Sequence, residues 1–259
     1  MLARKLDLDK THESHRLFDV GYRIRLLRDL LASVQANENA VLQALWTDLH
    51  KSREQAISFE LCAVYHELHY FIAHLKELAT PESRHKSIST INARLYERPE
   101  PLGPALIVTP FNYPFHLSIV PLIGVLAAGN PIMLKYSRST PTVRSAVSKL
   151  LKDAKIPESV VCLYDGPNDE LFSGSPYALV VFTGSTAVGR KIYAQCAPTL
   201  TKCVLELGGA NPVLVAGDAD LKNAALNLTV GKFTNSGQTC ICPNYCCFYG
   251  SDERYEEFK

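Results

Sequence analysis

The feature that most constrains the fold is an alternation of short apolar segments with helix-length segments from about residue 91 onward. The apolar segments are rich in β-branched residues, which favours strands. Strands of this kind separated by helices are typical of a parallel sheet covered on both faces, so we predict an α/β fold. The expected strands are residues 105–109, 131–135, 160–164, 178–183, 202–207 and 212–216, and the expected helices are residues 116–128, 141–152, 169–173 and 188–197.

A helical block is predicted before this alternation, over about residues 17–79. Apolar residues recur there at spacings of three and four, as on one face of amphipathic helices. A third helix is expected over residues 53–78, and Pro81 with the polar residues after it ends the block. The histidines of this helix lack the i, i+4 pair of a metalloprotease helix, so we interpret them as packed or polar-face residues rather than metal ligands. They are His66, His69 and His74.

Composition excludes several classes of protein. The 259 residues are 47% hydrophobic and 20% charged, which is typical of a globular chain with one or two domains. Lys plus Arg number 27 against 26 Asp plus Glu, so no basic stripe for nucleic acid is expected. The most apolar stretch, residues 117–129, is shorter than the roughly 20 residues a bilayer needs and is predicted to be a buried helix. Residues 1–16 lack a secretory leader, so a cytoplasmic location is expected.

The eight cysteines are expected to be reduced in such a compartment. A zinc site would need two pairs at ligand spacing, and only Cys240 with Cys242 and the adjacent Cys246 and Cys247 come close. We therefore expect no metal, and we expect most of these thiols to be buried and inert.

Polar and glycine-rich segments follow several predicted strands. Ligands of parallel sheets bind at the carboxyl ends of the strands, where Pro110-Phe111-Asn112, Lys135-Tyr136-Ser137 and Gly184-Ser185-Thr186 lie. The segment from Gly184 to Gly189 could hold a phosphate on backbone N–H groups, although it matches neither a Walker loop nor GxGxxG. The alternative is a plain strand-to-helix turn with Ser185 or Thr186 as the N-cap.

Two further residues are candidates for chemistry. Cys240 follows small and polar residues instead of lying in an apolar periodic run, so it can be a nucleophile, with Cys242, Cys246 and Cys247 as competing candidates. Glu206 ends an apolar strand and precedes two glycines, a position that suits a general base better than packing.

Eight short motifs occur in one order along the chain. They are Asp48-Leu49-His50-Lys51, Glu100-Pro101-Leu102-Gly103, Phe111-Asn112-Tyr113-Pro114-Phe115, Ala127-Ala128-Gly129-Asn130, Leu134-Lys135, Phe182-Thr183-Gly184-Ser185-Thr186, Leu205-Glu206-Leu207-Gly208-Gly209 and Asn235-Ser236-Gly237-Gln238-Thr239-Cys240. With these motifs the chain resembles the amino-terminal portion of the aldehyde dehydrogenase family. It is most similar to the class 3 branch, which acts on fatty and aromatic aldehydes. The resemblance extends from about residue 17 to the end.

The resemblance implies a Rossmann-like parallel sheet preceded by an amino-terminal helical block, with the start of a second α/β catalytic domain. The expected divisions are residues 1–90 for the helical part of the cofactor domain, 91–205 for the dinucleotide-binding domain and 206–259 for the incomplete catalytic domain. It also implies that Cys240 attacks the aldehyde, that the Asn112 side chain and the Cys240 N–H hold the oxyanion, and that Glu206 activates the water that hydrolyses the thioester.

The same resemblance implies NAD or NADP as cofactor, with the pyrophosphate near residues 184–189 and Lys135 at the adenosine ribose. The expected cofactor-binding residues are Thr109, Pro110, Phe111, Lys135, Arg138, Gly184, Ser185, Gly189 and Leu207. The family usually has Pro-Ser-Glu after the ribose lysine, whereas this chain has Tyr136-Ser137-Arg138. Because Arg pairs with phosphate and Glu repels it, we predict that NADP is at least accepted.

The chain ends at Lys259, soon after Cys240 and just as a helix begins near Asp252. In the family, most of the catalytic domain comes after this point. We therefore expect exposed apolar surface and poor solubility or inactivity of this chain alone. A truncated, non-catalytic remnant or nucleotide-binding module is the alternative function. The complete protein is expected to take a small-molecule aldehyde and to form a homodimer, with residues 91–97 as a candidate interface strand.

Other enzyme classes use the same parts. Acyl-phosphate reductases of related architecture also combine a cysteine nucleophile with NADP, and only the resemblance argues against them. A thiol hydrolase would need a histidine base, yet no histidine follows His116. Oxidative pairing of Cys240 with Cys242 is a further hypothesis.

Overall fold

The computed structural model describes residues 2–259 and has a five-stranded parallel sheet at its centre. Its strands are β3 (Ala105–Val108), β4 (Ile132–Lys135), β5 (Val161–Tyr164), β6 (Leu179–Gly184) and β7 (Lys202–Leu207), in the order β5-β4-β3-β6-β7. Val108 at the end of β3 is level with Lys135 on one side and with Phe182 on the other. The predicted α/β class and the predicted strands of this sheet are confirmed, each within one residue at either end.

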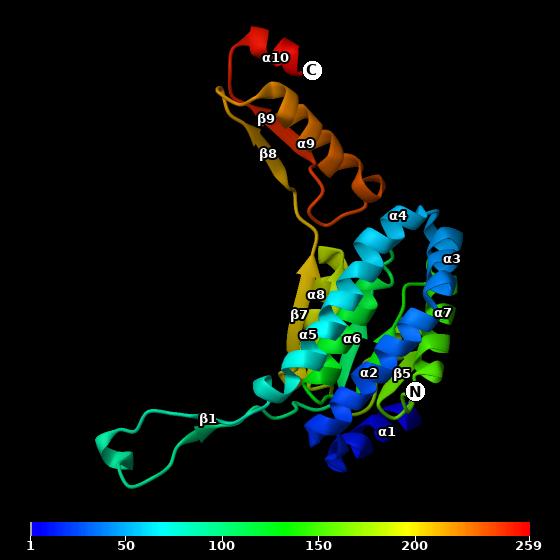
Figure 1. Cartoon of the computed structure of the whole chain (residues 1–259), viewed down its shortest axis with the longest axis vertical. Helices are drawn as coiled ribbons and strands as arrows, with labels where there is room; N and C mark the ends of the chain where they lie inside the picture. Colours follow the sequence, from blue (N-terminus) through cyan, green and yellow to red (C-terminus); the bar gives the residue numbers. More distant parts are fainter. Residues whose placement is uncertain (1) are drawn as a thin grey trace.

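Helices cover both faces of the sheet, as the apolar strands require (Figure 1). One face carries α2 (Val20–Ala36), α5 (Cys62–Leu78), α6 (His116–Ala127) and α7 (Pro141–Asp153), which share a core with Ala105 and Ile107 of β3. The other face carries α1 (Leu2–Glu13) and α8 (Thr186–Cys196), whose Leu8 and Ile192 pack with Leu106 of the same strand. Consecutive residues of β3 thus enter opposite cores, which explains why the strand has no polar alternation.

The predicted helical block is present. After α2 come α3 (Glu38–Leu49), α4 (Arg53–Ala56), a π-helical turn η2 (Ile57–Leu61) and α5. The expected single helix over residues 53–78 is therefore interrupted by the π turn, where Glu60 is completely buried. Helix α1 was not predicted, because it is mostly polar and buries only Lys5 and Leu8 among its described side chains. Short 3-10 turns are η1 (Arg16–Phe18), η4 (Asn168–Glu170) and η5 (Ala197–Thr199), and η4 stands where a helix over residues 169–173 was expected.

The chain between α5 and β3 forms an arm, which projects from the end of the molecule opposite to the carboxyl terminus (Figure 1). It contains β1 (Glu82–Ser83), the 3-10 turn η3 (Ile88–Thr90) and β2 (Tyr96–Glu97), with β1 and β2 antiparallel. The expected interface strand over residues 91–97 is wrong over most of its length, since only Tyr96 and Glu97 are in a strand. A turn and a bend occupy residues 91–93 and precede the strand.

A second lobe follows β7 and stands apart from the main sheet, in orange to red in Figure 1. It consists of β8 (Pro212–Val215), α9 (Leu221–Phe233), the turn η6 (Thr234–Gly237), β9 (Tyr245–Phe248) and α10 (Asp252–Phe258), and β8 pairs with β9 in parallel. The strand expected at residues 212–216 and the helix expected from Asp252 are confirmed, whereas α9 and β9 were not predicted. The proposed domain boundary after residue 205 falls inside β7, and the two sheets separate at residues 208–211. No helix within residues 2–259 is both long and apolar enough to cross a lipid bilayer.

Candidate active site

A cavity of about 460 Å³ lies at the carboxyl ends of β3, β6 and β7, against the segment that leads to Cys240. We call it the central cleft. It brings together many of the residues predicted from the sequence: Thr109, Pro110, Phe111, Asn112, Gly184, Ser185, Glu206 and Cys240. Other residues that line it were not among the predicted site residues, including Phe182, Thr183, Val188, Gly208 and the segment 237–239.

The order of the strands explains this position. From β3 the chain crosses to β4 on one side, and after β5 it returns to β6 on the other side of β3. The loops after β3 and β6 therefore diverge to opposite faces and leave a crevice between them. Gly184 ends β6 and Asn112 is in the loop after the neighbouring β3, so the topology places both in the crevice.

The segment before Cys240, residues 234–240, has an unusual backbone, and we call it the Cys240 loop. Asn235, Ser236 and Gly237 all have positive φ, at 53°, 56° and 74°. Residues other than glycine rarely adopt this backbone conformation. Asn235 and Ser236 are therefore strained, and surrounding contacts must hold them in place. Asn235 is buried, and its Nδ2 donates to the carbonyl of Asn112 at 3.0 Å and to that of Gln238 at 3.3 Å.

The loop after β3, residues 109–116, is tied to the Cys240 loop, and we call it the Asn112 loop. Asn112 Nδ2 donates to the carbonyl oxygen of Gln238 at 2.7 Å. The hydroxyl of Tyr113 is 2.8 Å from that of Thr239. Because Nδ2 carries two hydrogens, one remains available for a ligand in the cleft.

Glu206 and Cys240 reach the cleft from different units of the molecule. Glu206 is the fifth residue of β7, level with Thr183 of β6, and its side chain is exposed. Cys240 is also exposed, and its carbonyl accepts a hydrogen bond of 2.6 Å from Asn211 Nδ2. An accessible carboxylate and an accessible thiol thus line one cavity, which is what a two-step covalent reaction requires.

The competing cysteines lie elsewhere. Cys242 is buried, and its thiol donates to the carbonyl of Lys232 at 3.5 Å and to that of Pro243 at 3.6 Å. Cys246 and Cys247 are on β9, outside the central cleft, and burial raises the pKa of the Cys246 thiol. All eight cysteines have free thiols. Among the residues described here, no three His, Cys, Asp or Glu side chains are grouped to hold a metal ion.

The cleft also has features that fit a dinucleotide. Ser185 caps α8 by accepting from the Val188 N–H at 3.4 Å, so the helix begins beside the cleft with its amino end available to a phosphate. Thr109 is 5% exposed and its hydroxyl has no hydrogen-bond partner within residues 2–259, which leaves a polar atom for a ligand. These observations favour a cofactor with both polar and anionic groups.

The remaining predicted cofactor residues lie outside this cavity. Lys135 is the last residue of β4. Its pKa is lowered mainly by burial, and the positive charges of Arg138 and Arg144 lower it further. Gly189 is on α8, where a Cβ would come within 2.7 Å of Leu207 Cδ2. Helix-to-strand packing therefore explains the absence of a side chain at Gly189, and Leu207 is its partner.

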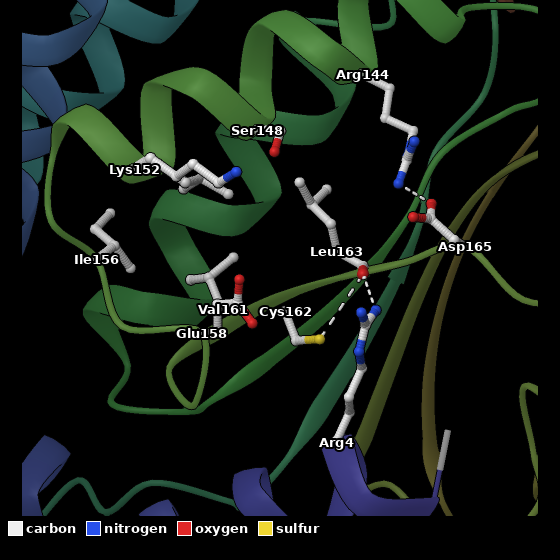
Figure 2. Close-up of a pocket in the computed structure, with 11 residues that line it drawn as sticks. Arg4, Arg144, Ser148, Lys152, Ile156, Glu158, Val161, Cys162, Leu163 and Asp165 are labelled. Atoms are coloured by element: carbon white, nitrogen blue, oxygen red, sulfur yellow. Dashed lines mark hydrogen bonds and ion pairs between the residues drawn. The ribbon is translucent and has the colours of Figure 1, made fainter.

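A second, smaller cavity of about 140 Å³ lies along the edge strand β5 and holds none of the predicted residues (Figure 2). Arg4 from α1 donates to the carbonyl of Leu163 at 2.8 Å, and Arg144 pairs with Asp165 (Figure 2). The Arg4 contact satisfies a carbonyl acceptor on the open edge of the sheet. We therefore interpret the residues around this cavity as a cover for the edge strand β5.

Comparison with known proteins agrees with this geometry. A profile of the Aldehyde dehydrogenase family matches residues 9–259. Aldehyde dehydrogenase family 3 member A2 of Rattus norvegicus is 34% identical over 256 residues, which are 97% of this chain and 53% of that protein. The dimeric NADP-preferring aldehyde dehydrogenase of Canis lupus familiaris is 35% identical over 225 residues, 86% of this chain and 50% of that protein.

Among solved structures, the substrate-bound state of Staphylococcus aureus AldH superposes with a TM-score of 0.93 at 29% identity, covering 99% of this chain and 56% of that one. This chain spans about half the length of the curated relatives it matches. The family profile nevertheless covers nearly all of its residues, and the chain therefore belongs to the aldehyde dehydrogenase family.

Proposed function

We propose that this chain carries the nucleophile and the cofactor-binding residues of an enzyme that oxidises an aldehyde to a carboxylic acid with NAD⁺ or NADP⁺. The observation that carries the proposal is the meeting of Cys240, Glu206 and Asn112 in one cavity. They come from a loop of the second lobe, the end of β7 and the loop after β3. A purely structural role does not explain why three polar groups so far apart in sequence converge there.

The first step assigned to these residues is attack of the Cys240 sulfur on the aldehyde carbon, which forms a thiohemiacetal. The Asn112 amide N–H that does not bind Gln238, together with the Cys240 backbone N–H, would hold the oxygen as it becomes negative. The contacts of Asn112 fix that amide next to the Cys240 loop before substrate arrives, so little reorganisation is needed.

A nicotinamide cofactor bound in the cleft would supply an acceptor for the hydride, so that the adduct on Cys240 would become a thioester. Glu206 then takes a proton from water, whose oxygen attacks the thioester carbon. The carbon–sulfur bond breaks, the carboxylic acid leaves, and Cys240 is restored. Residues Ser185 and Thr109 would hold polar groups of the cofactor at the amino end of α8 and at the end of β3.

We also propose that the adenosine end lies near Lys135 and Arg138 and that a 2′-phosphate is accepted there. Arg138 is exposed just after β4, and its charge is close enough to affect the Lys135 ammonium. A guanidinium beside a buried ammonium favours a dianion over a bare ribose hydroxyl. The name of the canine relative, which prefers NADP, supports this assignment.

A homodimer of the complete protein is a further proposal, supported by the word dimeric in the name of the same relative. The arm carries the exposed apolar residues Ile88, Ile91 and Tyr96, at 94%, 65% and 61% exposed, which suits a contact surface. Removing residues 81–99 is expected to leave a monomer in sedimentation analysis of the complete protein.

The test of the proposed function is formation of reduced cofactor from fatty and aromatic aldehydes by this chain and by its Cys240→Ala and Cys242→Ala variants. We expect Cys240→Ala to lower the rate by at least about a thousandfold. Cys242→Ala is the matched control, because Cys242 is in the same segment but buried. Equal measurable rates for the parent chain and Cys240→Ala would overturn the role of Cys240 as nucleophile. Binding of either cofactor with no aldehyde-dependent reduction would instead favour a non-catalytic nucleotide-binding module.

A further inference from the structure

A buried ion pair lies directly behind the central cleft. Lys51 Nζ is 2.5 Å from Glu60 Oε1, and the two residues are 5% and 0% exposed. Lys51 follows α3 and Glu60 is in the π turn η2, so both come from the amino-terminal helical block. Neither residue lines the cleft.

The other contacts of this pair are to the Asn112 loop. Lys51 Nζ donates to the carbonyl of Asn112 at 2.7 Å and lies 4.1 Å from the centre of the Tyr113 ring. Glu60 Oε2 accepts from the backbone N–H of Phe115 at 3.0 Å and from that of His116 at 2.8 Å. The pair therefore binds the loop at two places, in its middle at Asn112 and at its carboxyl end, where the loop enters α6.

The opposite side of the same loop holds the Cys240 loop. The Asn112 carbonyl that accepts from Lys51 also accepts from Asn235, and the Asn112 side chain donates to Gln238. A continuous set of hydrogen bonds thus runs from the helical block through Asn112 to the residues next to Cys240.

Stability alone does not explain this pair. Burial raises the pKa of Glu60 and lowers that of Lys51, so each charge loses hydration on folding. Apolar residues of similar volume are often as stable as a buried pair. An apolar pair, however, could not donate to the Asn112 carbonyl or accept from the two N–H groups that begin α6.

We propose that Lys51 and Glu60 are positioning residues that fix the Asn112 amide beside the carbonyl group attacked by Cys240. This inference rests on the proposed function, since it needs Cys240 as the nucleophile and Asn112 as an oxyanion donor. It gives the helical block a role in the reaction, although no residue of the block is proposed to touch substrate.

The test compares two reactions of Cys240 in the 259-residue chain, neither of which needs a cofactor. With p-nitrophenyl acetate, the sulfur attacks the ester carbon, the oxygen becomes negative, p-nitrophenolate leaves and the thiol proton passes to solvent. With iodoacetamide, the sulfur displaces iodide and no oxyanion forms. Peptide fragment spectra assign both products to Cys240.

The variant is Lys51→Met with Glu60→Gln, which removes both charges and keeps an acceptor for the N–H groups of α6. We expect its acylation to be at least about tenfold slower, as for loss of an oxyanion donor, and its alkylation to stay within about threefold. Asn112→Ala should slow acylation similarly, and combining the changes should add little. Lys149→Met with Asp153→Asn, an exposed pair on α7, is the matched control with parent rates.

Acylation at the parent rate in the Lys51 and Glu60 variant, with slow acylation in Asn112→Ala, would overturn the inference and leave the proposed function standing. If Asn112→Ala is also acylated at the parent rate, or Cys240 is not acylated at all, the proposed function fails with it. Should the double variant not fold, Lys51→Gln gives the same comparison. Its amide nitrogen is one atom short of the Lys51 Nζ and cannot reach both acceptors.

Discussion

At the scale of single residues, the cleft separates two tasks between Glu206 and Cys240. Glu206 is on a sheet strand and Cys240 is on a loop of the second lobe, so each side chain can be changed without moving the other. A carboxylate that only activates water is needed after the thioester has formed and not before. The two steps should therefore respond differently to loss of the carboxylate.

We expect Glu206→Gln to allow acylation of Cys240 and to block hydrolysis of the acyl group. With p-nitrophenyl acetate, one p-nitrophenolate per chain should be released at the parent rate, followed by turnover slower by about 10²-fold or more. Stopped-flow absorbance measures both phases, and intact mass should show the trapped acetyl group. Steady turnover at the parent rate would assign water activation to another group. Glu256→Gln, on exposed α10, serves as the control.

Arg138 carries a second prediction, on cofactor choice. Arg138→Glu places a negative charge beside Lys135, where a 2′-phosphate would be repelled and a ribose hydroxyl accepted. We expect the ratio of the NADP to the NAD dissociation constant to rise by about tenfold or more, measured by fluorescence titration. Arg28→Glu makes the same charge change at an exposed position of α2 and should leave the ratio unaltered. A parent chain that binds NADP more than about tenfold more weakly than NAD, with no change in Arg138→Glu, would exclude the assignment.

The sequence indicated residues at or shortly after the carboxyl ends of strands, and it did not indicate residues that act through them. Asn112, Gly184 and Glu206 were found because strand ends of a parallel sheet meet at one edge. Lys51 and Glu60 were not found, although Lys51 belongs to the motif Asp48-Leu49-His50-Lys51. Their partners are 61 and 55 residues away in the chain, and no local pattern encodes such a contact.

At the scale of elements, α1 shows how a helix can pack with few apolar residues. Leu8 is fully buried, and Lys5 is 2% exposed with its ammonium 3.7 Å from the centre of the Tyr177 ring. The ammonium has no hydrogen-bond partner among the described residues. Burial lowers the pKa of Lys5 from 10.5 to about 8, and the Asp9 carboxylate offsets part of this effect.

This gives a pH-dependent prediction for Lys5→Met. Because the folded-state pKa is below the unfolded value, burial of the charge destabilises the chain fully below about pH 8, and the effect fades as the pH rises toward 10.5. We expect the variant to unfold with about 1–3 kcal/mol more free energy at pH 7 and with little difference at pH 10.5. Chemical denaturation followed by circular dichroism measures it. Lys10→Met, exposed on the same helix, should show neither change, and a Lys5→Met variant that is less stable at pH 7 would show that the ring contact outweighs burial.

The Cys240 loop depends on its left-handed backbone, so Gly237→Ala is informative. A Cβ there would sit 3.2 Å from the Lys232 carbonyl, at a φ of +74°. We expect a loss of about 1–2 kcal/mol in stability together with slower acylation of Cys240. Gly124→Ala on α6, where a Cβ meets nothing within 4 Å, should keep the parent acylation rate. Unchanged acylation in Gly237→Ala would mean that the loop geometry does not set the reactivity of the thiol.

Helices and strands were predictable where burial produces a clear pattern of apolar residues in the sequence. Strands β3, β4 and β5 are buried on two faces, so their apolar runs identify them. Helix α9 and strand β9 gave no such signal, because their apolar side chains are not confined to one buried face. Leu226, Val230 and Phe233 of α9 are 60%, 58% and 70% exposed.

At the scale of the whole molecule, the core is distributed unevenly. Both apolar clusters lie within the main sheet and its helices. Cys196 is the last residue in the sequence that is buried in either cluster. In the second lobe, the buried hydrophobic residues are Val215, Leu221 and Cys242. Its exposed residues include Leu214, Ile241 and Tyr249, at 77%, 78% and 81% exposed.

A lobe with this little core and this much apolar surface is expected to associate with copies of itself. Exposed apolar area is normally covered in stable proteins, and the edges of the two-stranded sheet add unpaired backbone groups. We expect the 259-residue chain to form larger species as its concentration rises, in sedimentation velocity. Replacing Leu214 and Phe233 together by lysine should shift the chain toward monomer, because both residues lie on neighbouring elements of this lobe. Leu200→Lys tests whether the effect is local, since Leu200 is 90% exposed in the main lobe and outside this surface. If Leu200→Lys disperses the chain as well as the paired change does, association is a matter of net charge rather than of the second lobe.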